Sequence, residues 1–209
     1  MYIKDWMTRD PIVVSPDTPI MEAQKMMREN GIRRLPVVDA GELRGIVTYR
    51  DLIEAAPSDA TSLSIHELNY LLSKLTVNEV MTKDLVIVEP NETVEQAALK
   101  GTEKAVGALL VVDKGRLIGI ATVADLFRTV MTVLGAREDL QRITLEDVDV
   151  KQGTLQMICR VVEDAGGAMA SIISIPQRSS DLRMVVIRAR SIDYRTLENA
   201  LKDKGFAVH

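Results

Sequence analysis

Hydrophobic and polar positions follow the same series of patterns twice within the first 135 residues. An extended apolar run comes first, as in Ile12-Val13-Val14. Apolar residues at helical spacing come next and predict a helix with one buried face. Two apolar strands joined by a glycine-containing turn then predict a β-hairpin, and a last helix follows. Thr18 and Pro19 are predicted to be the N-cap and the first residue of the first helix. The helical stripe of the first copy comprises Ile20, Ala23, Met26 and Met27.

The two copies align without a gap from Trp6 to Leu52, with a period near 74 residues. Such a match over many positions indicates two copies of one structural unit. One unit alone has a small core, so we expect the two units to pack together and to leave clefts between them. The last helix of the second copy carries an apolar stripe that stops before Gly135. That stripe comprises Val123, Leu126, Phe127, Val130, Met131 and Leu134.

A strand-to-helix corner is the most strongly repeated feature. Gly45-Ile46-Val47-Thr48-Tyr49-Arg50-Asp51-Leu52 returns as Gly119-Ile120-Ala121-Thr122-Val123-Ala124-Asp125-Leu126. The threonine is predicted to cap the helix, and the aspartate is its third residue. Unpaired N–H groups at such a helix start bind phosphate well, and the carboxylate can accept hydrogen bonds from a sugar diol. The same residues also fit a purely structural helix cap, and the two interpretations are not exclusive.

The two corners differ in the charge that surrounds them. Arginine binds phosphate through its planar fork of donors, and the first copy has three arginines near the expected phosphate position. We therefore expect the better phosphate site in the first copy. The second copy is expected to hold a nucleoside-like ligand, to borrow charge from its neighbour, or to be empty. The arginines are Arg33, Arg34 and Arg50, and their counterparts are Gly107, Ala108 and Ala124.

Apolar runs ahead of each first helix offer walls for a flat base, although such runs are also common in plain cores. The residues concerned are Ile12, Val13, Val86 and Ile87. The series Met-Thr, Pro-Val-Val-Asp and Gly-Ile-Val-Thr-x-x-Asp-Leu resembles the CBS motif, named from cystathionine β-synthase. A tandem pair is similar to a Bateman module. This resemblance implies a regulatory protein that binds AMP, ADP, ATP or S-adenosylmethionine in its clefts, and it also implies a homodimer.

Residues 142–209 have a different pattern, whose elements run in the order βαββαβ, which is typical of a ferredoxin-like sandwich. The unit resembles an ACT domain, in which an amino acid usually binds at an interface. Gly153 matches the glycine of the ACT strand–helix turn, and Gln152 stands where a proline is common. The resemblance implies that Gly153 and Thr154 are the residues that would meet such a ligand. A CBS pair followed by this unit is similar to the acetoin-utilisation AcuB-type family.

We therefore expect a mixed α/β (α+β) chain that holds a Bateman module and an ACT-like domain. The expected parts are CBS motif 1 (1–56), a linker helix (57–75), CBS motif 2 (76–135) and the ACT-like domain (142–209). The linker is expected to be a polar loop followed by a helix capped near Ser64, with His66 in that helix. This arrangement, too, is similar to AcuB-type proteins.

Composition narrows the function further. The chain has 209 residues, a formal net charge of −4, one cysteine and two histidines. No basic excess suggests nucleic acid as a partner, and no apolar run suggests a membrane span. A single cysteine is typical of the cytoplasm. Neither a metal cluster nor an activated nucleophile is predicted, so an enzyme is not expected and no cofactor is required. The leading hypothesis is a nucleotide sensor acting on a partner protein; the alternative is a ligand-independent assembly scaffold.

Overall fold

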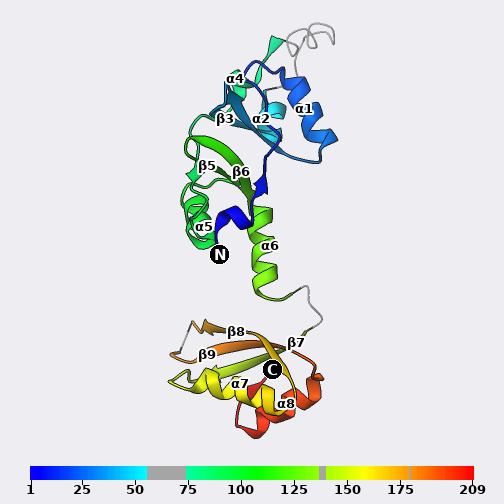
Figure 1. Ribbon diagram of the computed structural model, residues 1–209, viewed down its shortest axis with the longest axis vertical. Coiled ribbons are helices and arrows are strands. Elements are labelled where there is room, and N and C mark those ends of the chain that lie inside the picture. Colours follow the sequence, from blue (N-terminus) through cyan, green and yellow to red (C-terminus); the bar gives the residue numbers. More distant parts are fainter. Residues whose placement is uncertain (56–73, 137–139, 179) are drawn as a thin grey trace. The chain divides into compact units, whose positions relative to one another are not determined.

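The computed structural model describes residues 1–55, 74–136, 140–178 and 180–209 (Figure 1). The chain divides into two compact units, Met1–Arg128 and Thr129–His209. The predicted linker helix over 57–75, with its cap near Ser64, lies outside the described residues except for positions 74 and 75. The mixed α/β composition agrees with the predicted fold class.

The first repeat is built on a hairpin of β2 (Arg34–Asp39) and β3 (Glu42–Thr48). Helices α1 (Ile20–Glu29) and α2 (Tyr49–Glu54) accompany it. The predicted stripe of α1 is confirmed, since Ile20, Ala23 and Met27 are buried.

One local prediction for the first repeat is wrong, and one extended segment forms no strand. Thr18 does not cap α1, because its hydroxyl accepts from the N–H of Ser15 and Pro19 takes the cap position. The run at residues 12–14 is no strand, since only Val14 makes a β-bridge, to Val37.

The second repeat has the same two helices and hairpin in the same order, and it adds a short strand before its first helix. They are β4 (Ile87–Val88), α5 (Val94–Glu103), β5 (Ala108–Asp113), β6 (Arg116–Thr122) and α6 (Val123–Val133). Strand β4 runs parallel to β5, and β5 pairs antiparallel with β6. Helix α5 is capped by Thr93, whose side chain accepts from the N–H of Gln96. The repeated sequence thus produces a repeated local structure.

Each repeat is completed by the segment that precedes the other one. Helix η1 (Ile3–Asp5) places Ile3 in the core of the second repeat, and β1 (Thr8–Arg9) pairs with β6. In return, α4 (Val77–Val80) places Val77 in the core of the first repeat. Thr82 then bridges to Ile46 in β3. This exchange interlocks the two repeats and decides which side chains meet in the clefts between them.

The exchange also explains the glycine that opens each corner. The side chain of Met7 lies against Gly119, where an added Cβ would collide with its sulfur. The side chain of Met81 lies against Gly45 in the equivalent way, and a Cβ there would be 2.6 Å from its Sδ. The repeated Met-Thr and Gly positions are therefore two halves of one contact, made twice with the partners exchanged.

We expect Gly119→Ala to lower the free energy of unfolding by about 1–3 kcal/mol, because an overpacked contact forces side chains and backbone to shift. Gly101→Ala in α5 is the matched control. A Cβ there would meet Leu109 at 3.7 Å and the carbonyl oxygen of Val106 at 3.8 Å, both ordinary contacts, and alanine favours helix over glycine. Urea unfolding of both variants measures the difference, and equal stability of the two would contradict this packing.

The second unit is a four-stranded antiparallel sheet with two helices. Its strands are β7 (Gln141–Val148), β8 (Ala168–Pro176), β9 (Arg183–Arg190) and β10 (Ala207–Val208), in the order β10-β7-β9-β8. Helices α7 (Thr154–Asp164) and α8 (Tyr194–Asp203) share a buried core with the sheet. The βαββαβ order is that of a ferredoxin-like sandwich, as predicted.

Candidate functional site

Both repeated corners form reciprocal helix caps. At the start of α2 the N–H of Thr48 donates to Asp51 Oδ2 at 2.7 Å, and the N–H of Asp51 donates to Thr48 Oγ1 at 3.3 Å. At the start of α6 the N–H of Thr122 donates to Asp125 Oδ2 at 2.8 Å, and the N–H of Asp125 donates to Thr122 Oγ1 at 3.4 Å. The structural interpretation of the corner is thus realised in both copies, and it leaves a ligand function open.

Asp125 carries more hydrogen bonds than its counterpart. Its side chain is 6% exposed, and its Oδ2 also accepts from the hydroxyl of Thr122 at 2.7 Å. Its Oδ1 accepts from Nη1 of Arg128 at 2.7 Å. In the first repeat, the residue equivalent to Arg128 is Glu54. The two corners are therefore alike in their caps and different in the charge beside the carboxylate.

The corner of the second repeat opens into a cavity of about 450 Å³, which we call the Asp125 cleft. Thr122, Asp125 and Arg128 line it from the second repeat. The first repeat contributes Ile12, Arg33 and Arg34 among others. A buried carboxylate, a helix start, an apolar wall and arginines thus share one cavity.

The corner of the first repeat opens into a smaller cavity of about 170 Å³, which we call the Thr48 cleft. Thr48 lines it from the first repeat, opposite Val86, Gly107 and Ala108 of the second. These positions are the repeat equivalents of Ile12, Arg33 and Arg34 in the Asp125 cleft. Asp51 is not among the residues that line it. The two clefts are therefore related by the repeat, and each is built from both copies.

In the structure, the residues predicted to bind phosphate together do not all line the same cleft. The sequence-based prediction joined Arg33 and Arg34 to Thr48 and Asp51 because these four residues belong to one repeat. In the structure, Arg33 lines the cleft of Thr122 and Asp125 instead. The exchange of segments between repeats is the physical reason. The expectation that the second corner borrows charge from its neighbour describes this arrangement better than a stronger first site does.

Arg34 lies between the two clefts and lines both. Its guanidinium lies against Gly107, where an added Cβ would be 2.5 Å from Nη2. A side chain like that of Arg33 at position 107 would therefore displace Arg34. The glycine in the second repeat makes room for an arginine of the first.

Arg50 lines neither cleft. Its side chain is 83% exposed and donates to Glu54 Oε1 at 2.6 Å along α2. The hydrogen bond to Glu54, aided by the negative charge of Glu54, raises the pKa of Arg50 above its ordinary value. The predicted grouping of Arg50 with the phosphate residues is therefore not what the fold brings about.

The four apolar wall residues alternate in direction. Ile12 lines the Asp125 cleft and Val86 lines the Thr48 cleft. Their neighbours Val13 and Ile87 line other surface cavities. Extended backbone turns successive side chains to opposite sides, so only one residue of each pair can wall a ligand.

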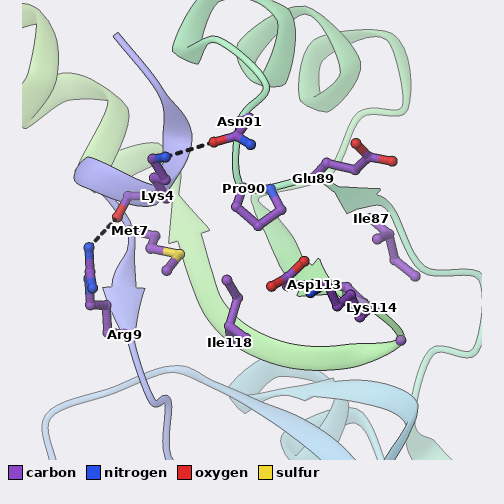
Figure 2. A pocket seen from close by; sticks show the side chains of 12 residues that line it. Lys4, Met7, Arg9, Ile87, Glu89, Pro90, Asn91, Asp113, Lys114 and Ile118 are labelled. Carbon is purple, nitrogen blue, oxygen red and sulfur yellow. Dashed lines mark hydrogen bonds between the residues drawn. The ribbon is translucent and has the colours of Figure 1, made fainter.

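A larger cavity of about 740 Å³ lies beside the β5–β6 turn, and Figure 2 shows its lining. Lys4 donates to Oδ1 of Asn91 at 2.7 Å, and Arg9 donates to the carbonyl of Lys4. Basic and acidic side chains are mixed around it, and no Thr-x-x-Asp corner reaches it. Of the predicted site residues it includes Ile87 alone. Size therefore does not identify the site here.

The predicted amino-acid residues of the second unit shape a turn. Gly153 has a φ of +89°, which glycine adopts readily, and it caps α7. The hydroxyl of Thr154 accepts from the N–H of Lys151 at 3.0 Å and donates to the carbonyl of Asp149. These bonds account for both residues structurally and leave their ligand function untested.

The described parts of the chain contain neither a candidate metal site nor a candidate membrane span. No group of three or more His, Cys, Asp or Glu side chains there is arranged to hold a metal ion. No helix there is long and apolar enough to cross a membrane.

Two interlocked repeats, each with a cleft at its strand-to-helix corner, define a paired-repeat module. The sequence profile of the CBS domain family matches residues 3–58 and 77–132, more than half of the chain. The chain therefore belongs to the CBS domain family and carries two CBS domains in tandem.

Comparisons with individual proteins agree. CBS domain-containing protein YhcV of Bacillus subtilis is 29% identical over 146 residues, which cover 70% of this chain and 97% of that protein. A solved structure of a candidate acetoin utilization protein (AcuB) from Vibrio cholerae is 30% identical, with a TM-score of 0.55 over 68% of this chain and 98% of that one. Other relatives are longer, and the match covers only 23% of an inosine-5'-monophosphate dehydrogenase from Korarchaeum cryptofilum.

Two similar solved CBS structures contain adenosine compounds. The CBS domain pair of protein MJ0100, in complex with 5'-methylthioadenosine and S-adenosyl-L-methionine, is 28% identical with a TM-score of 0.53, over 66% of this chain and 98% of that one. CBSX2, in complex with AMP, is 31% identical with a TM-score of 0.52, over 63% and 97%.

Proposed function

We propose that this chain is a cytoplasmic regulatory protein that binds an adenine nucleotide in the Asp125 cleft. The phosphate would lie at Arg33 and Arg34, the ribose at Asp125, and the base against Ile12. The observation that carries the proposal is that the arginines and the Thr122–Asp125 corner line one cavity. The AMP bound to CBSX2 and the adenosyl compounds bound to the MJ0100 pair support this ligand class.

Cavity size supports the same ranking of the two clefts. Sites for small ligands usually measure about 300–1,000 Å³. The Asp125 cleft, at about 450 Å³, falls in this range, and the Thr48 cleft, at about 170 Å³, falls below it. The Thr48 cleft shares Arg34 but lacks Arg33 and a lining aspartate from its own corner. We propose that it takes a nucleoside-like ligand, walled by Val86, or stays empty.

Regulation requires that the nucleotide favours one arrangement of the protein over another. The coupling equals the difference in affinity between the two arrangements, which is typically about 1–3 kcal/mol. We propose that the second unit is ACT-like and passes this state to a partner protein, with an amino acid as a further ligand near Gly153 and Thr154. The likeness to the candidate AcuB protein supports a link to acetoin utilisation.

Calorimetric titration with AMP, ADP, ATP and S-adenosylmethionine tests the ligand class. One nucleotide bound per chain is the expected result. Absence of heat with all four compounds, in protein shown to be folded, would contradict the proposal and favour the assembly scaffold.

The apolar stripe of α6 supports a homodimer. The sequence pattern predicted an apolar stripe on this helix, and of its residues Leu126 packs against the core of the second repeat. Phe127 is 67% exposed, and Val123, Val130 and Met131 are exposed as well. A contiguous exposed stripe of this kind typically marks an interface. We propose that α6 meets a second copy of the chain, and an assembly scaffold would use the same contact without a ligand.

We expect Phe127→Glu to raise the dissociation constant of the dimer about 30-fold or more, because buried aromatic residues are typical interface hot spots. Sedimentation over a range of protein concentrations measures this constant. Leu99→Glu on α5 is the matched control, since Leu99 is similarly exposed, at 60%. An unaltered chain that stays monomeric at all concentrations would contradict the dimer, and so would equal effects of the two variants.

A further inference from the structure

Protein donors already occupy most of the hydrogen-bond acceptor positions of the Asp125 carboxylate. A carboxylate offers about four acceptor positions on its two oxygens. Oδ2 accepts from the N–H and the hydroxyl of Thr122, and Oδ1 accepts from Arg128. At least three of the four positions are therefore taken. A vicinal diol that donates two hydrogen bonds cannot bind this carboxylate unless one of these donors leaves.

Arg128 is the donor that can leave. The N–H of Thr122 donates to Asp125 as part of the cap of α6, so breaking that bond would leave the start of the helix unsatisfied. The hydroxyl of Thr122 is held in the same cap, because it accepts from the N–H of Asp125. Arg128, in contrast, extends from the first turns of α6, and its side chain is 54% exposed. It also lines the Asp125 cleft, which Arg33 reaches from the other repeat. The guanidinium can therefore swing from the carboxylate to an anion in the same cavity.

We propose that Arg128 makes the Asp125 cleft selective for anionic nucleotides over uncharged nucleosides. The inference rests on the proposed function. A ribose diol must displace the Arg128 guanidinium from Asp125, which costs a charge-assisted hydrogen bond. A nucleotide offers that guanidinium a phosphate in return, and a nucleoside offers it nothing. The same side chain thus opposes one ligand class and assists the other.

The first corner supplies an internal comparison. Glu54 stands at the position of Arg128, and it pairs with Arg50 on the surface of α2 rather than with Asp51. Among the described residues, the ion pair of the first corner joins Arg50 to Glu54, and none joins a cation to the carboxylate of Asp51. The pairing of an arginine with the corner carboxylate is therefore a feature of the Asp125 cleft and not of the repeated unit in general.

The test compares the affinities of AMP and adenosine, which differ only by the phosphate, for the unaltered chain and for Arg128→Ala. We expect the variant to bind AMP about tenfold more weakly, since a hydrogen bond to a charged group is lost. Adenosine is expected to bind more tightly than before, because the carboxylate no longer has a competing donor. Arg44→Ala is the matched control, since Arg44 is an exposed arginine paired with Glu42 and Asp39 outside both clefts.

Weaker binding of AMP together with tighter binding of adenosine distinguishes this selective role of Arg128 from a role in packing alone. Parallel weakening of AMP and adenosine would overturn the inference and leave the nucleotide site standing. Unchanged affinities for both ligands in Arg128→Ala would overturn it as well. If the unaltered chain binds neither compound, the proposed function itself fails. Unfolding midpoints of all variants, measured without ligand, verify that each remains folded.

Discussion

The double substitution Arg33→Ala with Arg34→Ala is expected to lower the affinity for AMP by about a hundredfold or more. In the proposed site each guanidinium would donate charge-assisted hydrogen bonds to phosphate, and bonds to charged groups are worth about 1.5–3 kcal/mol each. Both side chains line the Asp125 cleft together with Asp125 and Thr122. Titration calorimetry with AMP measures the loss.

The variant Arg50→Ala tests whether the folded structure or the position in the repeat decides which arginines bind phosphate. The sequence places Arg50 with the other two arginines, whereas the structure places it on the surface, paired with Glu54. We expect this variant to change the affinity for AMP less than twofold, since no bond to the ligand is lost. A hundredfold loss in Arg50→Ala, with no loss in the double variant, would show that the phosphate lies at the first corner.

We expect AMP to raise the unfolding midpoint of Asp51→Asn but not that of Asp125→Asn. This is the second large effect. AMP at one hundred times its dissociation constant should stabilise the unaltered first unit by about 2.7 kcal/mol. For a chain of this size, that corresponds to a rise in the unfolding midpoint of about 5–10 °C. Asp125→Asn removes the charged acceptor of the ribose, so the rise should disappear.

The two asparagine variants control for each other, because each aspartate caps its own helix. Each variant should therefore lower the midpoint without ligand, and Asp125→Asn should lower it more because Asp125 is also paired with Arg128. The different responses to the ligand appear only when AMP is added. A rise that survives in Asp125→Asn and vanishes in Asp51→Asn would reverse the ranking of the two clefts.

Periodicity predicted the local structure well. The strand-to-helix corners begin at Thr48 and Thr122, as their capping residues indicate. The βαββαβ order of the second unit follows from its alternating patterns and from glycines such as Gly153. These features depend on residues close together in the chain, so they can be predicted from the sequence.

The pairing of residues across the repeats was beyond the same reasoning. Arg33 and Asp125 line one cleft because β1 pairs with β6 and Thr82 bridges to Ile46. Nothing in the 74-residue period tells which copy completes which. One signal was nevertheless present: Gly107 stands where Arg33 would be expected, and its missing side chain leaves room for Arg34.

The role of the exposed stripe of α6 also could not be predicted from the sequence. Helical spacing finds an apolar face at Phe127 and Val130, but it does not say what covers that face. A face that packs on the chain's own core and a face that packs on another copy have the same period. Only the exposure of Phe127 in the folded chain separates the two.

A crystal structure of the chain grown with AMP tests the central claim most directly. The account predicts the phosphate within hydrogen-bonding distance of Arg33 or Arg34 and the ribose hydroxyls at Asp125, with Arg128 turned away from the carboxylate. AMP bound at the Thr48 corner, or in the cavity beside Lys4 and Asn91, would contradict it.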